Sequence, residues 1–362
     1  MSKRRVLITA DPIGGVWTYA RNLIRAVPEF EWALCSMGAP LSPAQRLEFE
    51  RLPDVRVFEN VARLEWMDDP WSEVDAAGEW LLQIAQQFEP EIIHLNGYAH
   101  AALPWNAPVL VVAHSCVLSW WRAVKGEAAP ARYAEYARRV SSGLNHADAV
   151  VAPSEAMLRM LHENYGAHFA GRVIYNGVPL PPAPQEKRAQ IFAAGRFWDE
   201  AKNLRVLEAV AASVRWPVRI AGDLAAPGGE TITLRNAKAL GRVPAEELER
   251  ELTAAEIFVS PARYEPFGLS IAEAAAHGCT LVLGDIPTLR ELWRDSALFV
   301  RPDDPHMLAH VLNCLIQDRT MRLEFAGRAR RRVAQFSLPA MAEGYRAMYA
   351  DLRERRRIGA AA

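Results

Sequence analysis

The sequence has few cysteines and no long run of apolar residues. Its four cysteines, Cys35, Cys116, Cys279 and Cys314, are scattered over 362 residues and form neither a Cys-x-x-Cys pair nor a zinc-ligand spacing. This scarcity favours a reducing compartment, so we expect a cytoplasmic protein. The N-terminal segment has too short an apolar run for a signal peptide, and no run elsewhere is long enough to span a bilayer.

An excess of charge of either sign is also lacking. Lys and Arg together number 42 and Asp and Glu number 43, so nothing electrostatic favours nucleic-acid binding. The Arg-rich segment 353–357 is a candidate for peripheral contact with anionic lipid, and the alternative is a solvated helix face or a frayed end. The oligomeric state cannot be deduced from the composition.

Several nucleotide-binding motifs are absent. The chain contains no Gly-x-Gly-x-x-Gly fingerprint and no Walker A sequence, which argues against a dinucleotide fold and a P-loop enzyme. It also contains no Asp-x-Asp. The adjacent pairs Asp68-Asp69 and Asp303-Asp304 each stand beside a proline, so we interpret them as turn formers.

Short apolar runs alternate with amphipathic segments along the whole chain, a pattern typical of an α/β fold with parallel sheets covered by helices. We expect strands at 5–9, 91–95, 109–113, 149–152, 173–175, 190–194, 218–221, 238–240, 257–260 and 280–283. We expect helices at 17–27, 203–213, 245–252, 289–293, 305–334 and 340–356, and one from Gly268 to Gly278. A turn at Asn176-Gly177 and a proline-rich linker over 178–184 divide the pattern, so we expect domains at 1–178 and 185–336.

Two carboxylates, Glu265 and Glu273, are the most informative pair of residues. They are eight positions apart, where an apolar strand gives way to a helix. This spacing places Glu265 on the turn and Glu273 about two turns into the helix, with the first helical N–H groups, near Gly268 and Leu269, between them. A helix N-terminus is an anion site, and two carboxylates that accept hydroxyl hydrogen bonds beside it suit a nucleotide sugar. The alternative is a helix cap and a solvated glutamate.

The run Glu265-Pro266-Phe267-Gly268-Leu269 followed by Glu273 resembles the GT-B glycosyltransferases of glycosyltransferase family 4, the retaining enzymes with a Glu-x7-Glu motif. The resemblance extends through most of the chain. It implies two Rossmann-like parallel-sheet domains that face each other across a cleft, the first binding the acceptor and the second the nucleotide-sugar donor. It also implies that a C-terminal helix, at about 338–357, crosses back to the first domain.

The resemblance implies roles for residues that could hold the donor. Gly14 and Gly15 lie between the first strand and helix and free the backbone to approach a phosphate; a plain tight turn is the alternative. Arg196 offers a planar fork and Lys202 a mobile point charge, and the family places both on the diphosphate. Val243 would hold the base.

In the Glu-pair segment, Glu273 would bind the ribose and Glu265 the hydroxyls of the transferred sugar. The N–H groups of Phe267, Gly268 and Leu269 would bind the sugar or the phosphate.

His114 directly follows an apolar strand, and the family has a histidine there that contacts the transferred sugar. Glu265, His114, Arg196 and Lys202 are therefore the predicted catalytic residues. His94 and Asn96 also lie at a strand end, either as loop-shaping groups or as acceptor contacts. Trp120, Trp121 and Arg122 are candidates for the acceptor pocket, because aromatic faces stack on sugar rings; packing of a loop against the domain is the alternative.

These residues predict a retaining transfer of a hexose-type sugar from a UDP- or GDP-sugar to a hydroxyl of a small-molecule, glycan or lipid-linked acceptor. Because glycosyltransferases that use a metal typically hold it with Asp-x-Asp, we expect metal-independent activity without a cofactor. We favour a same-face mechanism. Two alternatives stay open: a GT-B sugar-nucleotide epimerase or hydrolase, and a non-catalytic sugar-nucleotide-binding protein.

Overall fold

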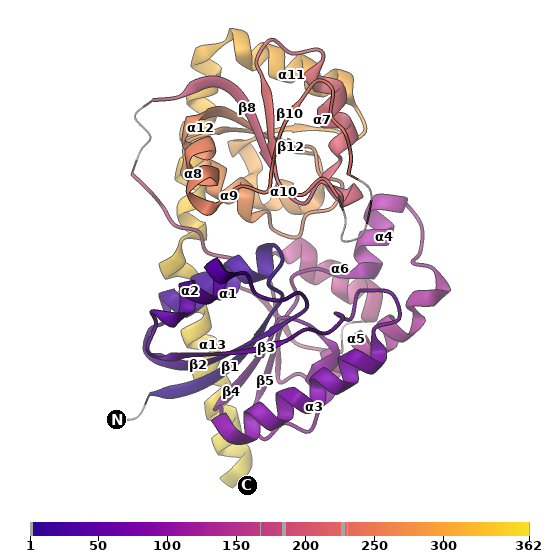
Figure 1. The fold of residues 1–362 in the computed structure, drawn as a ribbon, viewed down its shortest axis with the longest axis vertical. Coiled ribbons are helices and arrows are strands. Elements are labelled where there is room, and N and C mark those ends of the chain that lie inside the picture. The colour runs from indigo at the N-terminus through magenta and orange to yellow at the C-terminus, as the bar shows by residue number, and fades with distance from the viewer. Residues whose placement is uncertain (1–2, 167, 183–185, 226–228, 230, 362) are drawn as a thin grey trace. The chain divides into compact units, whose positions relative to one another are not determined.

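Both halves of the chain consist of a parallel sheet with helices (Figure 1). The computed structural model describes residues 3–166, 168–182, 186–225, 229 and 231–361. Of residues 359–361 it describes the backbone alone. Two compact units result: Met1–Arg122, Glu127–Gly177 and Leu338–Ala362 form the first, and Ala123–Gly126 with Val178–Ser337 form the second. Residues 183–185, at the expected start of the second domain, lie outside the described residues.

The first unit has a seven-stranded sheet in the order β3-β2-β1-β4-β5-β6-β7, with every neighbouring pair parallel. Its strands are β1 (Arg4–Ala10), β2 (Phe30–Met37), β3 (Val55–Asn60), β4 (Ile92–Leu95), β5 (Val109–Val112), β6 (Ala149–Ala152) and β7 (Gly171–Val173). β2 and β3 were not expected from the sequence, and β7 begins two residues earlier than we expected.

The helices of this unit are α1 (Gly15–Ala26), α2 (Pro43–Glu50), α3 (Trp71–Phe88), α4 (Val117–Lys125), α5 (Ala134–His146) and α6 (Glu155–Tyr165), with short 3-10 turns η1 (Ala99–Ala102) and η2 (Ala131–Tyr133). Side chains at their starts explain two of them. Ser42 forms a capping box with Gln45 at α2, and Ser154 accepts a hydrogen bond from the Met157 N–H at α6.

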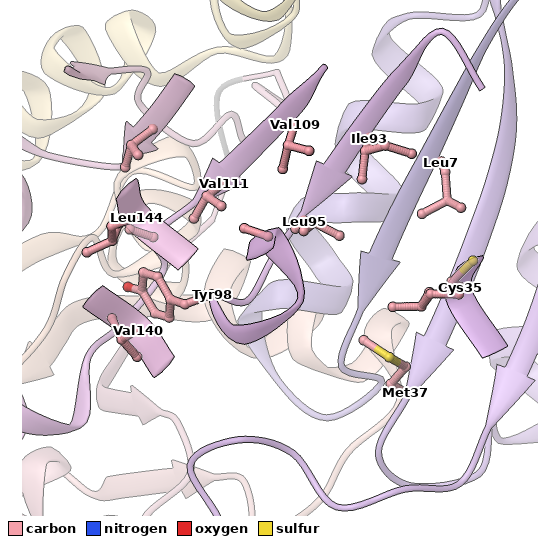
Figure 2. Packing of buried hydrophobic residues seen from close by; sticks show 14 of the residues in the cluster. Leu7, Cys35, Met37, Ile93, Leu95, Tyr98, Val109, Val111, Val140 and Leu144 are labelled. Carbon is pink, nitrogen blue, oxygen red and sulfur yellow. The ribbon is translucent and has the colours of Figure 1, made fainter. Parts of the chain in front are cut away.

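Alternate residues of the central strands face opposite sides of the sheet, so each side buries its own core. Leu7, Ile93 and Val111 belong to one core, which Figure 2 shows with Tyr98 and Leu144 packed against the strands. Their strand neighbours belong to the other core, namely Val6, Ile8, Ile92, Leu110 and Val112.

The last helix, α13 (Leu338–Ala361), belongs to the first unit, as we predicted from the family resemblance. Its buried face, which includes Met341, Tyr345, Tyr349 and Leu352, packs into the same core as α1 and the strand residues of that side. The chain therefore completes the first unit only with its final segment.

The second unit has a six-stranded parallel sheet in the order β10-β9-β8-β11-β12-β13. Its strands are β8 (Arg188–Ala194), β9 (Val218–Ala221), β10 (Lys238–Gly241), β11 (Ala255–Ser260), β12 (Thr280–Gly284) and β13 (Leu298–Val300). The fold class that we predicted, α/β with two Rossmann-like parallel-sheet domains, is confirmed.

The helices of the second unit are α7 (Leu204–Ala211), α8 (Ala245–Ala254), α9 (Leu269–Ala276), α10 (Pro287–Trp293), α11 (Pro305–Gln317) and α12 (Arg319–Val333), with 3-10 turns η3 (Glu200–Lys202), η4 (Arg294–Ser296) and η5 (Ala334–Phe336). The single helical tract expected over 305–334 is wrong. It divides at Asp318, whose side chain accepts a hydrogen bond from the Met321 N–H and so starts α12.

Each sheet reverses its strand order once. In the first unit β1 lies between β2 and β4, and in the second β8 lies between β9 and β11. In open parallel sheets, ligands bind outside the carboxyl ends of the strands at such a reversal, because the loops on its two sides diverge. The loops after β1 and β4, and those after β8 and β11, are therefore where each unit should bind its ligand.

One close contact in the first unit gives a test of its packing. A methyl group added at Gly143 on α5 would lie 2.0 Å from the Tyr98 carbonyl oxygen. We expect Gly143→Ala to destabilise the protein by about 1–3 kcal/mol, because the backbone must move apart. Gly327→Ala on α12, where the nearest atom is the flexible Arg331 Nη1 at 3.5 Å, should stabilise it by about 0.5–1 kcal/mol. Calorimetric unfolding measures both, and a Gly143→Ala transition at the wild-type temperature would contradict the packing.

Candidate active site

The loops after β8 and β11 bring together two of the predicted catalytic residues. Lys202 Nζ lies 2.5 Å from Glu265 Oε2, although the residues are 63 positions apart in the sequence. The Lys202 side chain is 21% exposed and that of Glu265 is 11% exposed. The two charges therefore form a partly shielded ion pair at the strand reversal of the second unit.

Asn203 holds Lys202 in place. It adopts a left-handed backbone conformation with φ of 59°, and its Nδ2 donates hydrogen bonds to the Pro261 carbonyl oxygen at 2.9 Å and the Pro302 carbonyl oxygen at 2.7 Å. These bonds tie η3 to the loops that follow β11 and β13. This role was not identified from the sequence, although asparagine is one of the few residues besides glycine that tolerate a left-handed conformation.

Gly268 lies against the side chain of Glu265. It precedes α9 with φ of 86°, and a methyl group there would lie 2.7 Å from Ile271 Cδ1 and 3.3 Å from Glu265 Cγ. The Phe267 ring is buried against Phe336, with ring centroids 5.4 Å apart, so only the backbone of Phe267 can contact a ligand. The first N–H groups of α9, from Leu269 on, therefore begin beside the Glu265 side chain.

Glu273 is closer to the start of its helix than we predicted. Because α9 begins at Leu269, Glu273 stands little more than one turn into the helix, not two. Its side chain is half-buried.

Arg196 and Val243 lie on loops at the same edge of the sheet. Arg196 follows β8, and its guanidinium lies over the Trp198 ring, 5.6 Å from the centroid. No hydrogen bond or ion pair within the described residues joins Arg196 to Lys202 or Glu265. Val243 is half-buried in the loop between β10 and α8.

In the first unit, the predicted glycine pair lies at the start of α1. Gly14 is the residue before the helix, with φ of 93°, and Gly15 is its first residue. The Asp11 carboxylate accepts a hydrogen bond from the Ile13 N–H at 2.8 Å and shapes the turn. The helix begins two residues earlier than we expected, so its N-terminal N–H groups directly follow the two glycines.

His114 and Asn96 lie at the ends of the neighbouring strands β5 and β4. His114 Nε2 is 2.8 Å from Asn96 Oδ1, and Asn96 Nδ2 donates to the Thr9 carbonyl oxygen at 2.6 Å. Burial lowers the pKa of His114 to about 3, so the imidazole is neutral at pH 7. The structure thus joins one predicted catalytic residue to one predicted acceptor residue.

His94 is not available to an acceptor. Its side chain is fully buried, with Nε2 3.1 Å from the Tyr19 hydroxyl and Nδ1 2.7 Å from the Tyr349 hydroxyl. Burial lowers its pKa to about 3 as well. Of the two interpretations that we left open, the acceptor contact is therefore wrong for His94, which holds α1 and α13 against β4.

Trp120, Trp121 and Arg122 all lie on α4 within an aromatic cluster. The Trp121 ring packs against Trp120 and Tyr133, with centroids 5.8 Å and 6.1 Å away. The exposed guanidinium of Arg132 lies 5.9 Å from the Trp121 centroid, and Arg122 pairs with Glu163 at 3.7 Å. Arg132 was not identified from the sequence, because only the fold brings it over the tryptophan.

Neither a metal cluster nor a membrane helix is found in the described part of the chain. No three His, Cys, Asp or Glu side chains there are grouped so that they could hold a metal ion. Among the same residues, no helix has the length and apolar character to cross a bilayer.

Comparison with curated proteins finds a relative over a limited segment. Ninety-nine residues are 38% identical to the O-antigen chain mannosyltransferase B of Escherichia coli. The match covers 27% of this chain and 26% of that protein, so the chain spans about a quarter of the relative's length.

Solved structures match over nearly the whole chain. The sucrose-phosphate synthase of Thermosynechococcus elongatus superposes with a TM-score of 0.78 at 18% identity, covering 99% of this chain and 100% of that one. Anabaena Alr3699/HepE in complex with UDP-glucose gives a TM-score of 0.74 at 16% identity, covering 96% and 99%. At these identities the likeness establishes the fold alone.

Two family models cover most of both units. Residues 13–180 match the model described as Glycosyltransferase Family 4, and residues 188–318 match the one described as Glycosyl transferases group 1. The two models together cover most of the chain, and with the parallel sheets and the returning helix α13 described above they support the superfamily of GT-B glycosyltransferases that includes family 4.

Proposed function

We propose that this protein is a retaining glycosyltransferase that moves a hexose-type sugar from a UDP- or GDP-sugar to a hydroxyl of an acceptor. The observation that carries the proposal is the contact between Lys202 and Glu265, 2.5 Å apart, at the strand reversal of the second unit and beside the start of α9. A cation, a carboxylate and helical N–H groups together suit a ligand that has both phosphates and hydroxyls.

Lys202 and Glu265 would separate when the donor binds. In the free protein the ammonium group neutralises the carboxylate. Lysine is a mobile point charge on a flexible stem, so Lys202 can turn to the diphosphate and leave Glu265 to accept a hydrogen bond from a sugar hydroxyl. Arg196 and the N–H groups of Gly268 and Leu269 would bind the remaining phosphate oxygens.

The other predicted donor contacts follow the family resemblance. Glu273 would hold the ribose and Val243 the base. On the first unit, Gly14, Gly15 and His114 are the candidates for contact with the phosphates and the sugar.

The transfer would take place on one face of the sugar. The bond from the anomeric carbon to the leaving phosphate oxygen breaks while the bond to the acceptor oxygen forms, and the acceptor proton passes to the leaving phosphate. Lys202 and Arg196 would stabilise the charge that grows on the leaving diphosphate, which is the role a metal ion has in other transferases. Configuration is retained without a covalent enzyme intermediate.

Two similar proteins bear on the identity of the donor sugar. The similar Anabaena structure holds UDP-glucose, and the E. coli relative is named a mannosyltransferase. Both names fit a hexose donor, and they differ in the sugar. The base therefore has to be measured.

The proposal can be tested by nucleotide binding and by two variants, one expected to weaken binding and the other to lower kcat. Purified protein is heated with UDP, GDP, ADP and their sugars, and a ligand at about 100 times its Kd should stabilise it by about 2.7 kcal/mol. Lys202→Met should weaken diphosphate binding by about 10- to 100-fold, the loss of one charge-assisted hydrogen bond. Glu265→Gln should keep that binding and lower kcat by about 10²- to 10³-fold.

A matched control separates these effects from the loss of an ion pair as such. Arg219 Nη2 lies 2.5 Å from Glu251 Oε1 in the same unit, with side chains 21% and 14% exposed, and the pair joins β9 to α8 away from the strand reversal. Arg219→Met should therefore leave nucleotide affinity and kcat unchanged. The proposal fails if no nucleotide raises the melting temperature, or if Glu265→Gln retains the wild-type kcat.

Metal independence is a separate prediction. Because Lys202, Arg196 and the start of α9 supply positive charge at the phosphates, sugar transfer or donor hydrolysis should continue at the same rate after treatment with EDTA. The rate is measured with the donor that binds in the melting experiment. A loss of activity that Mg²⁺ or Mn²⁺ restores would contradict the prediction.

The aromatic cluster on α4 predicts where the acceptor binds. Replacing Trp120 and Trp121 together by alanine should raise the acceptor KM by about 10-fold or more, since each stacked ring contributes about 0.5–1.5 kcal/mol. The Kd for the donor nucleotide should stay at its wild-type value. Unchanged acceptor kinetics in a folded double variant would show that the cluster is not part of the acceptor site.

A further inference from the structure

The hydrogen bonds around Asn96 have only one consistent direction. The Thr9 carbonyl oxygen can only accept, so the Asn96 atom that lies 2.6 Å from it must be the amide nitrogen. The Asn96 N–H also donates to Thr9 Oγ1 at 2.9 Å, which fixes the backbone of the same residue. The amide oxygen of Asn96 is therefore turned to His114.

This orientation determines which nitrogen of His114 carries the proton. Asn96 Oδ1 can only accept, so the His114 nitrogen 2.8 Å from it, Nε2, must donate. Because burial lowers the pKa of His114 to about 3, the ring has a single proton at pH 7, and that proton is on Nε2. Nδ1 then has a free lone pair.

The surroundings of His114 do not alter this state. The Tyr19 ring on α1 lies 4.5 Å from it edge-on, and burial raises the pKa of Tyr19 well above its usual value. His94 on β4 is a second titratable neighbour, and it too is neutral at pH 7. Neither group places a charge next to the His114 ring.

His94 differs from His114 in one respect that matters. Both of its nitrogens are bonded, to the hydroxyls of Tyr19 and Tyr349. The Nδ1 of His114 has no such partner in the part of the chain that the structure describes, and the His114 side chain is half-buried where that of His94 is fully buried. Of these two histidines, His114 is therefore the one that has a ring nitrogen left for an external ligand.

We propose that Asn96 is a positioning residue that holds His114 in the Nε2–H tautomer, so that Nδ1 accepts a hydrogen bond from a hydroxyl of the bound sugar. The inference rests on the proposed function and makes it more specific. An accepting nitrogen attracts hydroxyl groups and not phosphate oxygens, which have no proton to donate at neutral pH. Asn96 itself uses both ends of its amide within the protein, so it acts through His114 and is not an acceptor contact.

The wild-type tautomer can be measured directly. Nitrogen-15 NMR of the full chain with labelled histidine should show His114 protonated at Nε2 and unprotonated at Nδ1, and His114→Gln assigns its signals. His100 is an internal reference, because its Nε2 must donate to the Val74 carbonyl oxygen at 2.8 Å and has the same tautomer for an independent reason. An Nδ1–H or charged His114 at pH 7 would overturn the proposal.

The choice of ligand separates a hydroxyl contact from a phosphate contact. UDP-glucose should move the Nδ1 signal of His114, whereas UDP alone, which lacks the sugar, should leave it unchanged. GDP-mannose and GDP form the second pair if the melting experiment favours guanine. An equal response to the diphosphate and the sugar nucleotide would overturn the hydroxyl contact.

Asn96→Asp gives the proposal a pH signature. A carboxylate beside an imidazole raises the histidine pKa by about 1–3 pH units. His114 would then gain its second proton as the pH falls toward about 5, and Nδ1 would change from acceptor to donor. The sugar hydroxyl would then have to turn and accept, giving up the proton that it donates in the wild type, so the KM for UDP-glucose in this variant should shift by up to about 10-fold between about pH 8 and pH 5, while the wild type shows no such shift.

The outcomes distinguish this inference from the proposed function. If no nucleotide stabilises the protein, the proposed function fails, and the wild-type NMR spectrum still decides the role of Asn96. If a nucleotide sugar binds and the Nδ1 signal does not respond, the transferase proposal stands and the hydroxyl contact is wrong. An Asn96→Asp variant with wild-type histidine signals and a wild-type pH profile would overturn the positioning role.

Discussion

Lys202 and Glu265 are 63 residues apart in the sequence, and the parallel pairing of β8 with β11 is what brings them together. Ile191 pairs with Ile257 and Phe192 with Phe258, so the two strands end side by side at the strand reversal. Because side chains alternate across a strand and β8 is buried on both faces, a shift of one residue would exchange the side chains that fill its two cores. The apolar pattern that stabilises the core thus also decides which loops meet.

Close backbone contacts keep those loops in place. A methyl group at Gly222, which follows β9, would lie 1.8 Å from the Gly195 carbonyl oxygen, and one at Gly284 would lie 2.3 Å from the Ala262 carbonyl oxygen. The loops after β8 and β11 are therefore each packed against a neighbouring strand end, with no side chain between the backbones. The flexible side chain of Lys202 can therefore move from Glu265 to a ligand while the backbone of the surrounding loops keeps its position.

The sequence was sufficient for the α/β class, since apolar strands are local patterns, and it singled out Lys202 and Glu265 as candidates without predicting that they are in contact. It was not sufficient where distant segments decide the outcome. His94 looked like a candidate contact at a strand end, and Tyr349, which buries it, comes 255 residues later on α13. Asn96 is fixed by Thr9, 87 residues earlier. The strands β2, β3 and β13 were not predicted from the sequence; β2 pairs with β1, β3 with β2, and β13 with β12.

His94 and His114 show why burial alone does not identify a functional histidine. Burial lowers the pKa of both to about 3, and both stand at the ends of neighbouring central strands. What separates them is the number of hydrogen bonds that the protein itself supplies. His94 has a partner on each nitrogen and is a structural link between α1, β4 and α13. Among the residues that the structure describes, His114 has one partner, Asn96. Its second nitrogen acquires a defined chemistry only because the amide of Asn96 cannot be turned the other way against the Thr9 carbonyl.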